Sequence, residues 1–129
     1  MLYLFLKQYY KSIIIGGLIT WLSLSGSQSM IPGRMLEIPY VDKIGHFCMY
    51  AFFSAVLLLD SCKWQYDGRF NYLILLIPVI FGALMEIMQM ALTTSRRAEA
   101  LDLAADIAGI AAGIVLALFS KRVLRAIRS

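Results

Sequence analysis

The stretch YLILLIPVIFGALMEIMQMAL, residues 72–92, is the longest almost uncharged apolar run of the sequence and indicates its fold class most clearly. It runs for 21 residues and contains a single charged residue, Glu86. A helix needs about 20 apolar residues to cross the hydrocarbon core of a bilayer, so this stretch predicts a transmembrane helix. Pro78 lies inside the stretch and predicts a kink, which membrane helices tolerate because their neighbours satisfy the freed carbonyl group.

Three further apolar stretches, residues 9–24, 43–59 and 101–119, are each bounded by charged or turn-forming residues. The composition agrees with a membrane protein, because 60% of the residues are hydrophobic and only 16% are charged, against about 25% charged in soluble domains. The chain of 129 residues is too short for two domains. The sequence therefore predicts an all-α fold, a four-transmembrane-helix bundle that forms a single domain over residues 1–129.

The distribution of the 12 lysine and arginine residues predicts the orientation in the membrane. If both termini lie inside, the inner segments hold eight of them, namely Lys7, Lys11, Lys63, Arg69, Lys121, Arg122, Arg125 and Arg128. The outer segments hold the other four, Arg34, Lys43, Arg96 and Arg97. Cytoplasmic loops carry the excess of basic residues, so we expect the N- and C-termini inside. The net charge of +4 does not indicate a nucleic-acid partner, since no basic stripe with interleaved aromatic residues is present.

The first apolar stretch has a second interpretation. Lys7 and Lys11 precede 13 mostly apolar residues, as in a secretory signal peptide. No cleavage site of the A-x-A type follows, and another apolar run, residues 2–6, precedes the lysines. We therefore expect the stretch to remain as a membrane helix, and cleavage would leave the next stretch starting on the same outer side.

Polar residues gather near the outer ends of three predicted helices. Although basic residues alone set the orientation, six of the eight acidic residues and the only histidine fall on the outer side or in the outer half of a helix. Within each helix the spacing of three or four residues places the polar side chains on one face. The residues on these faces are Asp42, His46 and Tyr50 on the second helix, Glu86 and Gln89 on the third, and Asp102 and Asp106 on the fourth, with Lys43 next to Asp42 and Arg96 just before the fourth helix.

Three interpretations of this cluster remain open. Ionisable groups within a membrane helix cost about 2.5–3.5 kcal/mol each, so they normally face the bundle interior and pair. The first interpretation is a structural ion-pair network that fixes the helix register, for example Arg96 with Asp102 and Lys43 with Glu86. The second is an active site, and the third is a binding site for a lipid head group or an antibiotic. For Asp42, capping of its helix is a further possibility.

The functional interpretations assign a role to each residue. As an active site, the cluster would have His46, Glu86, Asp102 and Asp106 as catalytic acids and bases, and the same four are candidate ligands for a divalent cation. The substrate-binding residues would be Asp42, Lys43, Tyr50, Gln89 and Arg96, with Lys43 and Arg96 holding the oxygens of an anionic ligand such as phosphate.

At these residues the sequence resembles the VanZ-like family of bacterial integral membrane proteins. The resemblance begins at residues 31–33, continues in the pattern D-K-x-x-H-F-x-x-Y at residues 42–50, and resumes in E-x-x-Q at residues 86–89. It ends with R-x(5)-D-x(3)-N/D at residues 96–106 and a glycine-rich helix with Gly109 and Gly113. Many family members have Asn where this chain has Asp106, and Arg97 beside Arg96 leaves the assignment of the arginine open.

The resemblance implies an envelope role in the bacterial cytoplasmic membrane, and the family takes its name from resistance to the glycopeptide antibiotic teicoplanin. It implies no substrate. Our first hypothesis is an envelope enzyme or accessory factor that lies among membrane lipids and whose outward-facing polar pocket engages a phosphorylated lipid or cell-wall intermediate. The alternative is a non-enzymatic binding or assembly protein with a structural polar cluster, in which the G-x-x-x-G face of Gly109 and Gly113 recruits another helix or forms a homo-oligomer. A small transporter, which would need oligomerisation, is a third hypothesis.

Overall fold

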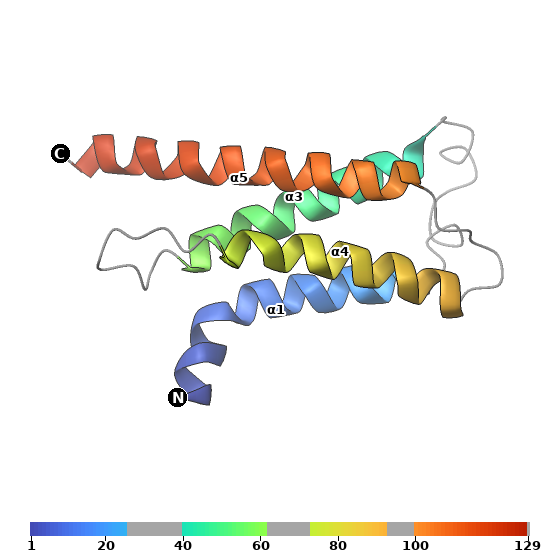
Figure 1. Cartoon of the computed structure of the whole chain (residues 1–129). Coiled ribbons are helices and arrows are strands. Elements are labelled where there is room, and N and C mark those ends of the chain that lie inside the picture. Colours follow the sequence, from blue (N-terminus) through green and yellow to red (C-terminus); the bar gives the residue numbers. More distant parts are fainter. Residues whose placement is uncertain (26–39, 62–72, 93–99, 129) are drawn as a thin grey trace.

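The computed structural model describes residues 1–25, 40–61, 73–92 and 100–128 (Figure 1). Within these ranges the chain forms four long helices, α1 (Leu2–Leu24), α3 (Val41–Ser61), α4 (Leu73–Leu92) and α5 (Ala100–Arg128). The prediction of an all-α fold with four helices is confirmed. The sequence placed the boundaries well for α3 and α4 but made α1 and α5 too short.

The N-terminal end of α1 and the C-terminal end of α5 differ from the prediction for a physical reason. The first helix starts at Leu2 because the run before Lys7 contains no helix breaker, so the lysine interrupts the apolar run without ending the helix. The last helix continues from the predicted end at residue 119 to Arg128, since the basic tail is also free of Gly and Pro. Charge therefore marks where a helix leaves apolar surroundings and does not mark where it stops.

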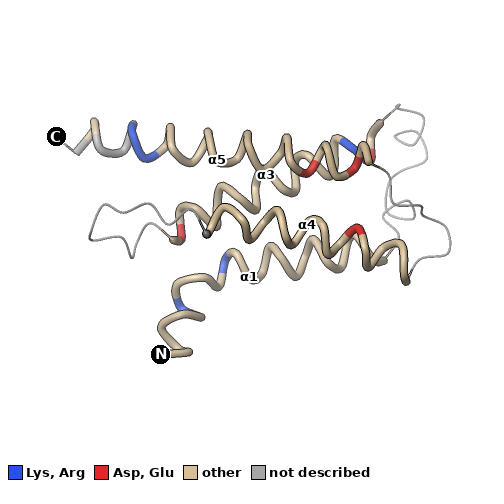
Figure 2. Tube along the Cα trace, in the orientation of Figure 1, with Lys and Arg blue, Asp and Glu red and all other residues tan. Residues whose placement is uncertain are grey.

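The helices run alternately in opposite directions, so both chain termini lie at the same end of the bundle (Figure 1). The C-terminal ends of α1 and α4 and the N-terminal ends of α3 and α5 lie at the opposite end. Charged residues are concentrated toward the two ends and are sparse between them (Figure 2). This arrangement brings the polar first turns of α3 and α5 to the end that also holds Glu86 of α4.

Helices α3 and α5 lie in close contact because two glycines on α5 face the backbone of α3. A Cβ atom added at Gly109 would collide with the carbonyl oxygen of Phe47, and one added at Gly113 would collide with that of Ala51 and with the hydroxyl of Ser54. The G-x-x-x-G pattern therefore acts inside the bundle. Self-association through the same face stays a prediction, and a second copy would have to compete with α3 for it.

The core is aromatic and aliphatic and lies between α1, α3, α4 and α5. Its buried members Ile19, Tyr50, Phe53 and Ile110 come from α1, α3 and α5, and Phe81 of α4 packs against them. The rings of Phe53 and Phe81 are tilted, with their centroids 5.3 Å apart, an ordinary aromatic packing geometry. This core fixes the relative positions of the helix segments that carry the polar cluster.

Three helices are long and apolar enough to cross a membrane, over Val41–Ser61, Ile74–Leu92 and Ala100–Val123. Many large apolar side chains on these helices point outward, as expected where lipid surrounds the bundle. The chain is therefore a multi-pass helical membrane protein. The first helix, α1, is not among the three, because the polar run KQYYKS at residues 7–12 lowers the hydropathy of every 18-residue stretch of it.

Candidate functional site

The site begins at the first turn of α3. Tyr40 adopts a left-handed backbone conformation (φ 64°) just before the helix and accepts a hydrogen bond from the backbone N–H of Ile44. Asp42 lies within the first turn, where its charge faces the positive end of the helix dipole, so it does not occupy the capping position considered from the sequence. His46 and Tyr50 follow at intervals of four residues, and both are buried, as their common helix face predicts.

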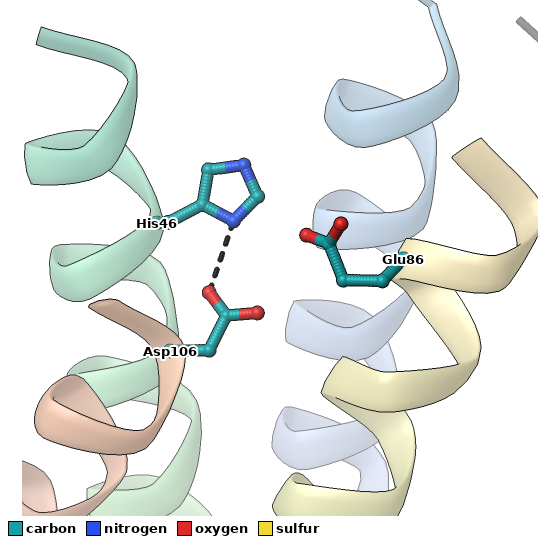
Figure 3. Close-up of side chains that lie close together, drawn as sticks. All are labelled: His46, Glu86 and Asp106. Carbon is teal, nitrogen blue, oxygen red and sulfur yellow. Dashed lines mark hydrogen bonds and ion pairs between the residues drawn. The ribbon is translucent and has the colours of Figure 1, made fainter. Parts of the chain in front are cut away.

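Three side chains from three helices converge below this turn: His46 from α3, Glu86 from α4 and Asp106 from α5 (Figure 3). Nδ1 of His46 lies 2.9 Å from Oδ1 of Asp106. One potential ligand atom from each residue lies within 4.8 Å of the other two. All three residues are buried, and Asp106 retains only 1% of its accessible surface. This trio of ionisable groups thus shares one small interior region.

Two polar atoms in this region have no hydrogen-bond partner among the described residues: Oδ2 of Asp106 and the hydroxyl of Tyr50. Both residues keep only 1% of their surface exposed. Gly82 of α4 lies opposite them, and a Cβ atom there would come within 3.4 Å of Asp106 Oδ2 and 3.3 Å of the Tyr50 ring. Buried acceptors are almost always paired in native proteins, so these two atoms require an explanation.

A second polar group lies closer to the end of the bundle. Nζ of Lys43 is 2.8 Å from Oδ1 of Asp102 and 3.2 Å from Oδ2 of Asp42. The Lys43 and Asp102 side chains retain 14% and 11% of their surface, so this pair is largely withdrawn from solvent, whereas Asp42 is 40% exposed. The group links the first turns of α3 and α5.

The structure divides the predicted cation ligands. Within the described part of the chain, the cluster able to hold a metal ion consists of His46, Glu86 and Asp106. The fourth predicted ligand, Asp102, is paired with Lys43 instead, one helical turn away. Sequence spacing showed that Asp102 and Asp106 share a helix face, but it could not show which of them faces a lysine and which faces a histidine.

Two further predicted substrate-binding residues are Gln89 and Arg96. Gln89 is buried, and its side-chain amide donates a hydrogen bond of 3.2 Å to the carbonyl oxygen of Ser23 at the end of α1. One of its roles is thus to tie α4 to α1. Arg96, predicted to hold an anionic ligand, lies outside the described residues.

The opposite end of the bundle holds a buried polar cluster that the sequence analysis did not single out. Asp60 of α3 keeps only 2% of its surface, and its carboxylate accepts a hydrogen bond of 2.9 Å from Ser12 of α1. The Gln8 side chain donates to the Asp60 backbone carbonyl at 3.0 Å. The signal was the spacing of Gln8 and Ser12, which lie one turn apart and therefore share one face of α1.

A cavity of about 520 Å³ opens between α1, α3 and α4, away from the ionisable residues of the trio. Gly16 and Gly17 leave room for it on α1, and Phe53, Leu57 and Phe81 form much of its wall. Its lining is almost entirely apolar, so it suits a hydrocarbon chain and offers nothing to a phosphate group. This cavity therefore does not hold the acidic and basic groups of the candidate site, which lie in the region of His46, Glu86 and Asp106.

Comparisons with models of protein families, with curated proteins and with solved structures found no match. The case for function consequently depends on the geometry of the site.

Proposed function

We propose that the chain is a VanZ-like protein of the bacterial cytoplasmic membrane that crosses the bilayer four times with both termini inside. In this proposal the polar cluster lies at the outer side and engages the anionic group of a phosphorylated lipid or cell-wall intermediate. Two features support it: the termini share the end of the bundle opposite to the polar cluster, and the basic residues favour termini inside.

The observation that carries the proposal is the concentration of polar chemistry in one buried region. Lys43, His46, Glu86, Asp102 and Asp106 come from three helices and meet at a single end, although each is costly to place in a membrane helix. Lys43 lies at the rim of this region and supplies the positive charge that a phosphate requires. The trio beneath it supplies acids and bases for a reaction at that phosphate.

The test is mass spectrometry of a total membrane lipid extract before and after incubation with the purified protein. The proposal predicts that a phosphorylated lipid is altered, or copurifies stoichiometrically, with the wild type and not with the double variant His46→Ala, Asp102→Asn. The matched control is Asp60→Asn, which changes an equally buried carboxylate at the other end. A lipid profile that is the same for all three proteins, with no copurifying phosphorylated lipid, would contradict the proposal.

The second candidate function is a structural or assembly role, and the Lys43–Asp102 pair favours it. Ion pairs between helix ends can specify register without any ligand. In that case conservative changes to the cluster would reduce stability, and neither the wild type nor the variants would alter or copurify with a phosphorylated lipid. The two functions are separated by measuring stability and lipid content on the same variants.

A further inference from the structure

We propose that His46, Glu86 and Asp106 form a binding site for a divalent transition-metal ion of the Zn²⁺ or Mn²⁺ class. The inference deepens the proposed function, since it concerns the same end of the bundle, but it is tested by metal binding alone. Its starting point is the convergence of one imidazole and two carboxylates, whose ligand atoms lie within 4.8 Å of one another (Figure 3).

The unpartnered carboxylate oxygen of Asp106 is the independent observation that points to a ligand. Asp106 has 1% of its surface exposed, and its Oδ1 atom is engaged by His46 while its Oδ2 atom has no partner among the described residues. A buried carboxylate oxygen without a donor or cation is unfavourable in apolar surroundings, because it has lost its hydration and gained no partner. A cation bound by both acidic groups would remove that cost.

Gly82 keeps the space beside this oxygen open. A side chain as small as that of alanine would bring its Cβ atom to 3.4 Å from Asp106 Oδ2 and 3.3 Å from the Tyr50 ring, closer than most contacts of real Cβ atoms. Gly82 lies in the middle of α4, where glycine forms helix less readily than alanine, leucine or methionine would. The glycine therefore preserves room next to the atom that lacks a partner.

The donor set selects the class of metal. Imidazole nitrogen suits Zn²⁺ and other transition metals, whereas Mg²⁺ and Ca²⁺ prefer sites made of oxygen alone. Two carboxylates and a neutral imidazole carry a charge that one divalent ion balances, which matters most where water is excluded. Within the described part of the chain the cluster contains no thiolate, and Asp102 is withdrawn from the set by its pairing with Lys43.

The separations of the three groups are compatible with closure around an ion. Zinc ligands lie about 2.0–2.2 Å from the metal, which places tetrahedral ligands roughly 3.4 Å apart. The ligand atoms of the trio therefore need to approach one another by an ångström or so, a change within reach of the flexible Glu86 side chain. Three protein ligands leave a fourth position, which is where an anionic oxygen of the proposed lipid, or water, would bind.

The experiment measures metal bound to the full chain, purified in detergent and stripped with a chelator. The protein is equilibrated with Zn²⁺, Mn²⁺, Mg²⁺ or Ca²⁺ alone, desalted and analysed by inductively coupled plasma mass spectrometry. We expect about one equivalent of Zn²⁺, weaker binding of Mn²⁺, and at least a tenfold lower affinity for Mg²⁺ and Ca²⁺. His46→Gln, Glu86→Gln and Asp106→Asn should each weaken Zn²⁺ binding by tenfold or more, the size of effect seen when even supporting residues of a metal site are removed.

Two further variants keep the test decisive. Asp60→Asn removes the same charge from an equally buried site and should retain wild-type Zn²⁺ binding. Gly82→Ala leaves all three ligands in place but fills the space beside Asp106, so it should reduce Zn²⁺ affinity even if a ligand variant fails to fold. The inference is overturned if the wild type binds no stoichiometric metal, or if Zn²⁺ binding is the same in the ligand variants and in Asp60→Asn. Stoichiometric Zn²⁺ without any lipid effect would leave the site in place and refute only the lipid proposal.

Discussion

Asp106 is a buried carboxylate that is only partly paired. It is the most deeply buried acidic residue of the described chain, and one of its two carboxylate oxygens, Oδ2, has no hydrogen-bond partner among the described residues. A sequence optimised for stability alone would have an amide or an apolar residue there, because a buried carboxylate needs full pairing. Retaining such a group is typical of sites where binding has been favoured over stability.

A double-mutant cycle measures how much the Lys43–Asp102 pair contributes to stability. We expect Lys43→Met and Asp102→Asn each to lower the free energy of unfolding. Lys43→Met takes the lysine away from the largely buried Asp102 carboxylate, and Asp102→Asn removes the nearer of the two carboxylates, Asp42 and Asp102, that contact Lys43. The double variant should be destabilised by less than the sum, with a coupling energy of about 0.5–3 kcal/mol. Chemical unfolding in a single detergent is the measurement, and strictly additive losses would show that the pair contributes nothing to stability.

At the scale of helices, the contact between α3 and α5 should be the most sensitive to added volume. Gly113→Ala places a methyl group against Ala51 and Ser54, so the helices must separate, and we expect a loss of about 1–3 kcal/mol. Gly17→Ala is the matched control, because nothing lies within 4 Å of a Cβ atom there. That change should be neutral or stabilise the helix by up to about 1 kcal/mol. Equal effects of the two changes on thermal unfolding would refute the close contact.

The attachment of α1 to α3 gives a second prediction about helices. Ser12→Ala removes the donor that pairs with the buried Asp60 carboxylate, which should cost about 1–3 kcal/mol and loosen α1 from the bundle. Faster limited proteolysis within α1 is the expected result. Ser120→Ala is the control, since the exposed Ser120 hydroxyl bonds only within its own helix, to the carbonyl of Leu116. If both variants are cleaved at the wild-type rate, Ser12 does not anchor the helix.

The sequence predicted helices better than it predicted partners. Apolar length located α3, α4 and α5, and spacing along α3 correctly gathered His46 and Tyr50 on one face. Partners could not be deduced, because which carboxylate of α5 faces Lys43 and which faces His46 depends on the rotation and depth of two helices. The cluster around Asp60 was missed for a related reason: its other members lie 48 and 52 positions away in sequence.

At the scale of the whole molecule, the orientation is the property most open to direct test. The excess of basic residues at the end that holds both termini predicts that this end is cytoplasmic. Alkaline phosphatase fused after Ser129 should be inactive, and the same reporter fused after Leu92 should be active. The control is a green fluorescent protein fused at the same two positions, which should give the opposite pattern. Active phosphatase after Ser129 would invert the topology and place the polar cluster inside.

We propose that the buried trio of His46, Glu86 and Asp106 is a binding site and not a structural network. The most direct test is the thermal unfolding midpoint of Asp106→Asn against the wild type, both in detergent and free of metal. If the trio is a binding site, the variant should have an equal or higher midpoint, because an amide can keep the contact with His46 while the cost of a buried, incompletely paired charge disappears. A structural ion pair between His46 and Asp106 would instead cost about 3–5 kcal/mol when broken. A midpoint lowered by several degrees would therefore contradict the claim.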